Sequence, residues 1–154
     1  MVEALLGALS PEWRAHVEVP VSRPARGVID VVLERPASGL LVATEVDSEL
    51  RRLEQQIRWS SEKAASLGSA TLVRDGSDPI VSTLLVLRST ASTRQLARQF
   101  EVTLRSAYPA PTRSVVESLR VGSEWPGPGI VWIRIEGERV DLLDAPPRGV
   151  RLGR

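Results

Sequence analysis

The chain of 154 residues contains no cysteine and only one histidine, His16. The absence of cysteine excludes disulfide bonds, thiolate zinc sites and cysteine nucleophiles. A metal site in this chain would therefore be built mainly from oxygen ligands, which magnesium, manganese and calcium prefer. Carboxylates are the side chains to examine for metal chemistry.

Long apolar runs and a strong net charge are also missing. No run approaches the roughly 18 residues that cross a bilayer, and residues 1–8 carry Glu3 but no basic leader, so we expect a cytoplasmic protein without a membrane partner. The net charge of +1 gives no general argument for nucleic acid. With 42% apolar and 25% charged residues, the chain can bury a core. We expect one domain over residues 1–144 and a flexible tail over residues 145–154.

Strands are predicted where apolar residues alternate, or run without interruption, between turn residues. The segments of this kind are residues 16–21, 26–33, 40–46, 80–88, 130–136 and 140–143. The second and third are apolar at nearly every position, which indicates central strands covered on both faces. Gly137-Glu138 separates the last two and predicts a closing hairpin.

Helical spacing of apolar residues predicts an amphipathic helix over residues 49–67, which Gly68 ends. A second helix follows the capping-box spacing from Ser92 to Gln95, and residues 113–120 form a short third one. The arginines of the second helix, Arg94, Arg98 and Arg105, form either a basic strip or a solvated face.

The beginning of the chain allows two interpretations. Ser10, Pro11 and Glu12 have the residue types of a helix start. Alternatively, residues 3–9 form the helix and Pro11 ends it.

Three carboxylates, Asp30, Glu45 and Asp47, lie in the two strongest predicted strands. Side chains alternate faces along a strand, so Glu45 and Asp47 point the same way, about 7 Å apart. Asp30 is surrounded by valines and an isoleucine, where an ionised carboxylate is costly unless it is paired or bound to a cation. If the strands are antiparallel neighbours, Asp30 lies opposite Glu45 or near it. A divalent cation would then relieve the repulsion among the three acids and could activate a water.

Structural roles are an alternative for the same acids. Asp30 could form an ion pair with Arg26, Arg52 or Arg88. Asp47 could cap the helix that begins after it.

Lys63 is the only lysine, and it lies with Glu49, Arg52 and Gln56 on one edge of the apolar stripe of the predicted helix. From there Lys63 could reach a phosphate or orient a water. Alternatively, its stem covers apolar surface while the ammonium stays in solvent. Trp59 lies just outside the same edge, where packing is the commoner role of tryptophan and base stacking the rarer one.

Asp30, fourteen intervening residues and then Glu45-Val46-Asp47 resemble the signature of the PD-(D/E)XK nuclease superfamily. The chain is more closely similar to the nuclease-like C-terminal domain of actinobacterial helix-turn-helix proteins, over roughly residues 16–135. Residues 26–30, 45–50, 62–63 and 84–104 carry this likeness. It implies an α/β fold with a restriction-endonuclease-like core, in which helices flank a central mixed sheet in the order α-β-β-β-α-β.

The resemblance also implies a site. Asp30, Glu45 and Asp47 would hold magnesium or manganese, Lys63 would add positive charge, and DNA would be the partner. The family, however, usually has a lysine two residues after the glutamate, where it helps bind the scissile phosphate, and this chain has Asp47. Some restriction enzymes of the superfamily work with an acid in that position. No helix-turn-helix precedes the core, so we expect DNA reading to be missing or supplied by a separate protein.

Three functions follow from these observations. Asp47 in the lysine position and the near-neutral charge favour a nucleic-acid-associated domain with weakened or lost catalysis and a binding or regulatory role. The acidic trio with Lys63 favours an active magnesium-dependent endonuclease. A protein-interaction or structural domain without nucleic acid is the third, because one fold serves many functions.

Overall fold

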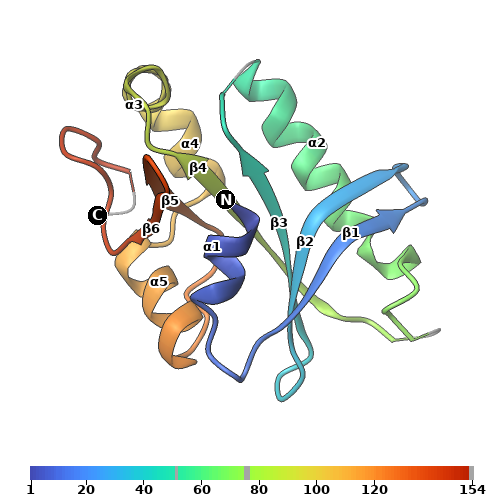
Figure 1. The fold of residues 1–154 in the computed structure, drawn as a ribbon. Coiled ribbons are helices and arrows are strands. Elements are labelled where there is room, and N and C mark those ends of the chain that lie inside the picture. The colour runs from blue at the N-terminus through green and yellow to red at the C-terminus, as the bar shows by residue number, and fades with distance from the viewer. Residues whose placement is uncertain (51, 75–76, 153–154) are drawn as a thin grey trace.

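The computed structural model describes residues 1–50, 52–74 and 77–152. It is an α/β fold with a six-stranded mixed sheet in the order β1-β2-β3-β4-β5-β6, flanked by helices (Figure 1). The first three strands, β1 (Arg14–Val21), β2 (Gly27–Arg35) and β3 (Leu40–Asp47), form an antiparallel meander. The predicted α/β class and element order are confirmed, whereas the nuclease-like identity of the core stays a prediction.

The rest of the sheet is built through crossovers, because parallel neighbours need a long connection. Helix α2 (Leu53–Ala65) leads to β4 (Ile80–Arg88), which runs parallel to β3. Strand β5 (Gly129–Glu136) is parallel to β4, and β6 (Arg139–Leu143) closes the predicted hairpin with it. The remaining helical segments are α1 (Val2–Gly7), the 3-10 turn η1 (Leu67–Ser69), α3 (Ala91–Gln99), α4 (Glu101–Ala107) and α5 (Thr112–Val121).

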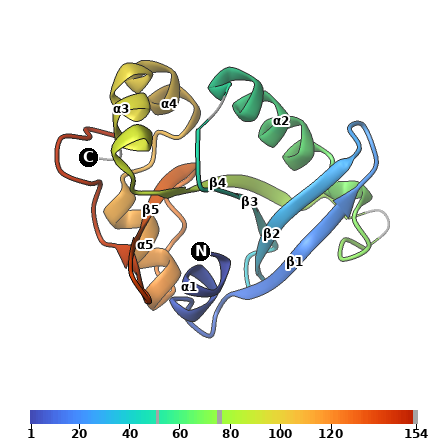
Figure 2. The same cartoon turned by 45° about the horizontal axis from the view of Figure 1, so that its top comes forward.

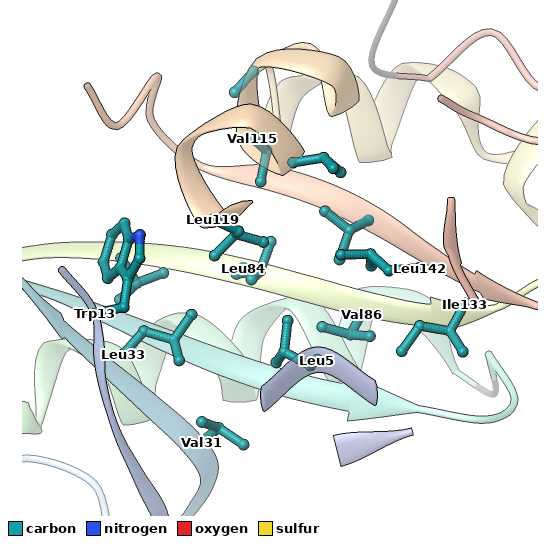
Figure 3. Packing of buried hydrophobic residues seen from close by; sticks show 14 of the residues in the cluster. Leu5, Trp13, Val31, Leu33, Leu84, Val86, Val115, Leu119, Ile133 and Leu142 are labelled. Carbon is teal, nitrogen blue, oxygen red and sulfur yellow. The ribbon is translucent and has the colours of Figure 1, made fainter. Parts of the chain in front are cut away.

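The helices cover the two faces of the sheet. Figure 2 shows α1 and α5 on one side and α2, α3 and α4 on the other. Leu5 of α1 and Leu119 of α5 pack with Val31 and Leu33 of β2 in the core drawn in Figure 3. On the opposite face Val32 packs with residues that include Ala64 of α2. The buried middle strands therefore present one face to each helical layer, as their continuous apolar sequence predicts.

Two predicted helices have other boundaries in the structure, and the first helix decides between two interpretations. The first helix is α1, Val2–Gly7, so the interpretation in which it ends before Pro11 is confirmed. Helix α2 begins at Leu53 instead of residue 49, because Arg52 has a left-handed backbone with φ of 52° that cannot continue a helix; Arg51 lies outside the described residues. The helix predicted after Ser92 is two helices that meet at Phe100.

The division at Phe100 also separates the predicted basic strip. Arg94 and Arg98 lie on α3, and Arg105 lies on α4, where it forms an ion pair with Glu101 at 2.8 Å. The three arginines therefore do not belong to one continuous helix.

The segment after β6 contributes to the core. Val150 and Leu152 of the expected flexible tail are fully buried and pack in the cluster that contains Leu104 and Trp132. The two buried side chains are separated by the exposed Arg151, and the segment packs against the core although it forms no strand. Residues 153–154 lie outside the described part. In the part of the chain that the structure describes, no helix has the length and apolar character to cross a membrane.

Candidate functional site

The predicted site residues lie around one end of β3, on the face that α2 covers. Glu45 and Asp47 are the last residues of β3 on that face, and they pair in register with Leu85 and Leu87 of β4. Asp30 comes from the neighbouring β2, and Lys63 comes from α2. Antiparallel pairing of β2 with β3 and the crossover through α2 bring these segments together.

Lys63 makes the strongest contact with a predicted acid. Its Nζ lies 2.5 Å from Oε2 of Glu45 and donates a second hydrogen bond, at 2.9 Å, to the carbonyl of Val28. The lysine stem passes over Gly27, where a Cβ atom would lie 3.0 Å from Cδ of Lys63. Lys63 therefore points its charge at the sheet and forms an ion pair, and it does not extend its ammonium into solvent.

Asp30 is held by the backbone. Its Oδ2 accepts a hydrogen bond of 2.8 Å from the N–H of Val46, just beyond the last paired position of the two strands, Val31 opposite Thr44. In the described part of the chain Asp30 forms no ion pair with a basic side chain. A backbone donor, and none of the three arginines considered above, satisfies this carboxylate.

Asp47 does not cap a helix, because α2 begins only at Leu53 with Arg52 at its N-cap. Burial raises the pKa of Asp47 above its ordinary value, the negative charge of Asp30 raises it further, and the Lys63 ammonium opposes both. Asp47 and Asp30 are thus close enough for their charges to interact, as expected for acids on one sheet face.

Glu45 is the most perturbed carboxyl of the group. Burial raises its pKa from 4.5 to about 7, because removing an ion from water disfavours the charged form. The hydrogen bond and charge of Lys63 lower the pKa, while Asp30 and Asp47 raise it. The second oxygen of Glu45, Oε1, is buried and has no hydrogen-bond partner within the described residues.

Glu45 and Asp47 line a cavity of about 220 Å³ between β3, α2 and the end of α4. Apolar walls come from Leu50, Leu53, Ile57 and Leu85, and aromatic walls come from Trp59 and Tyr108.

Sequence reasoning missed two polar residues of this cavity. The hydroxyl of Ser60 is buried and interacts with the Tyr108 hydroxyl. Burial raises the pKa of Tyr108, the hydrogen bond with Ser60 opposes this rise, and the negative charges of Glu45 and Asp47 add to it. The periodicity of α2 places Ser60 one turn before Lys63 on a neighbouring face, whereas nothing local in the sequence brings Tyr108 to β3.

The carboxylate oxygens are the right donor type for magnesium or manganese. Within the described residues, however, no three His, Cys, Asp or Glu side chains are grouped so that they could hold a metal ion. Lys63 lies against Oε2 of Glu45, and the Val46 N–H lies against Oδ2 of Asp30. This arrangement does not fit a three-carboxylate metal centre, and the ligand set Asp30, Glu45 and Asp47 stays a prediction.

Comparisons with known proteins do not assign the chain to a family: no protein-family model, no curated protein and no solved structure matches it.

Proposed function

We propose that this chain is a nucleic-acid-associated domain of nuclease-like construction, in which phosphodiester cleavage is weakened or lost and the role is binding or regulation. The observation that carries the proposal is the ion pair between Lys63 and Glu45 at 2.5 Å. A lysine meant to bind a scissile phosphate needs an available charge, and here a carboxylate neutralises it. The lysine position of the resembled signature holds Asp47, which supplies no positive charge.

Binding would use the same end of the sheet. Arg26 is exposed beside Lys63 and Trp59, and no described acid pairs with it. An unpaired guanidinium of this kind is suited to phosphate contacts. Since the net charge of the chain is only +1, affinity would be modest and would depend on a few local cations.

The proposal is tested by a pair of assays on the purified chain. Supercoiled plasmid incubated with magnesium or manganese should stay intact, and labelled DNA should bind at about 50 mM salt and dissociate as the salt rises. Cleavage that disappears in Asp30→Asn would favour the active endonuclease instead. The interaction between the charges of Asp30 and Asp47 supports that alternative. Absence of DNA and RNA binding at low salt would remove nucleic acid from the account and favour a protein-interaction role.

A further inference from the structure

We propose that the cavity beside Glu45 receives one unpaired nucleobase of a single-stranded nucleic acid, and that a hydrogen-bond donor on the base faces Oε1 of Glu45. This inference rests on the proposed function and names the part of the nucleic acid that the site would recognise. It concerns binding alone and includes no chemical step.

An unsatisfied polar atom points to a ligand. Oε1 of Glu45 is buried and has no hydrogen-bond partner within the described residues. Glu45 lines the cavity together with Ser60 and Tyr108, whose hydroxyls interact with each other. A buried polar atom without a partner costs free energy that a hydrogen-bonding ligand recovers. Glu45 supplies an acceptor, and the interacting hydroxyls of Ser60 and Tyr108 add polar groups to the cavity wall.

The size and walls of the cavity favour a small planar group. Its volume of about 220 Å³ is below the roughly 300–1,000 Å³ of sites that enclose drug-sized ligands. Leu53, Ile57 and Leu85 supply apolar surface, and the Tyr108 ring supplies an aromatic wall. A single heterocycle has the matching character, with apolar faces and a polar edge, and enzymes that enclose a base use the same combination of contacts.

Trp59 connects this cavity with a second hollow on the surface. Its side chain is 53% exposed, and it lines both the cavity and the neighbouring hollow that includes Arg26 and Val28. An exposed indole next to a base pocket offers a stacking platform for the adjacent base. Arg26 is placed for the phosphate between them. Glu62 on the same rim is paired with Arg58 at 3.9 Å, which reduces its repulsion of the strand.

The hydrogen-bonding capacity of Oε1 of Glu45 predicts which bases bind. Oε2 is engaged by Lys63, so the remaining oxygen accepts one hydrogen bond and donates none while the ion pair persists. Cytosine carries an amino donor at the position where thymine carries a carbonyl acceptor. Two pyrimidines of nearly equal size therefore present opposite groups to Glu45, and cytosine is the one that fits.

The experiment is run at about pH 8, above the pKa of Glu45. It measures fluorescence anisotropy of labelled oligo(dC) and oligo(dT) of about 12 nucleotides, a length within the usual range of single-strand sites. The two probes have the same number of phosphates, so a difference in Kd reports on the bases. A hydrogen bond to a charged group predicts binding of oligo(dC) about tenfold tighter than oligo(dT). The matching duplex, whose bases are paired, should bind more weakly than oligo(dC).

Variants separate base recognition from general attraction. Glu45→Gln keeps a carbonyl oxygen that accepts from Lys63 and turns an NH2 donor toward the base, so it should bring the Kd values of the two probes within about twofold of each other. Trp59→Ala should weaken both probes, while Val102→Ala, at an 84% exposed position on α4, should change neither.

The possible results distinguish failure of the base pocket from failure of the proposed function. Equal affinities for oligo(dC) and oligo(dT) that Glu45→Gln leaves unchanged would overturn the base pocket while the proposed function stands. Binding of neither probe and no duplex would overturn both proposals.

Discussion

Glu45 provides the sharpest quantitative prediction, because its pKa is raised from 4.5 to about 7 by burial. A carboxyl whose pKa is higher in the folded state binds its proton more tightly there than in the unfolded chain. Its contribution to stability is therefore fully present below pH 4.5 and is lost as the pH rises to about 7. The pKa difference corresponds to about 3 kcal/mol of unfolding free energy, at about 1.4 kcal/mol for each pH unit. Asp47, whose pKa is also raised, adds a loss of the same sign.

The substitution that isolates this effect is Glu45→Gln, since the amide resembles the protonated carboxyl in shape and charge. At pH 4.5 the variant and the wild type should have similar unfolding free energies in urea. At pH 8 the variant should be more stable by up to about 3 kcal/mol, because it avoids the desolvated negative charge. Glu138→Gln, at an exposed position of the β5–β6 turn, is the matched control and should follow the wild-type pH profile.

The opposite result would refute the reasoning on charge burial. If the wild type gains stability relative to Glu45→Gln between pH 5 and pH 8, the attraction of Lys63 outweighs the desolvation of Glu45. The ion pair would then be a net stabilising contact.

Three further substitutions test the fold by urea denaturation, with Val102→Ala at the exposed surface as a control that should stay within about 0.5 kcal/mol. Ser60→Ala removes a buried hydroxyl that interacts with the Tyr108 hydroxyl and should cost about 1 kcal/mol; a neutral or stabilising result would mean that this interaction contributes nothing to stability. Gly129→Ala would place a Cβ 2.5 Å from Cγ2 of Val115 and should cost about 1–3 kcal/mol, and a neutral result would contradict this close contact of β5 with α5. Thr90→Ala removes the N-cap hydrogen bond of α3 and should cost about 1 kcal/mol.

The strands could be predicted from sequence because their signal is local. Residues 26–33 and 40–46 are rich in β-branched and apolar side chains. Strand β3 contains the whole second segment, and β2, which begins at Gly27, contains all of the first except Arg26. The segment over residues 80–88 coincides with β4. Since a buried strand needs apolar side chains on both faces, its composition alone identifies it.

Helix ends were harder to predict because single backbone torsions decide them. The apolar spacing places Leu50 in the helix. Leu50 is buried, but it belongs to the loop that precedes α2. The left-handed conformation of Arg52 is not encoded by a glycine or an asparagine. Phe100 likewise lies on the apolar stripe although the helix breaks there.

The carboxylates of the candidate site could be predicted from the sequence, but the residues that surround them could not. Alternation places Glu45 and Asp47 on one face, and both line the cavity. Tyr108 reaches the same cavity only through the path of α3 and α4 across the sheet, which no local pattern encodes. The hydrogen bond from the Val46 N–H to Asp30 likewise depends on where the pairing of β2 and β3 ends.

The most direct test of the central claim is the affinity of the wild-type chain for single-stranded DNA as a function of salt. The account predicts measurable binding at about 50 mM salt, and a logarithm of affinity that falls linearly with the logarithm of salt concentration, with a shallow slope from few phosphate contacts. Absence of binding at that salt concentration, or an affinity that does not change with salt, would contradict a nucleic-acid role for the surface around Glu45 and Lys63.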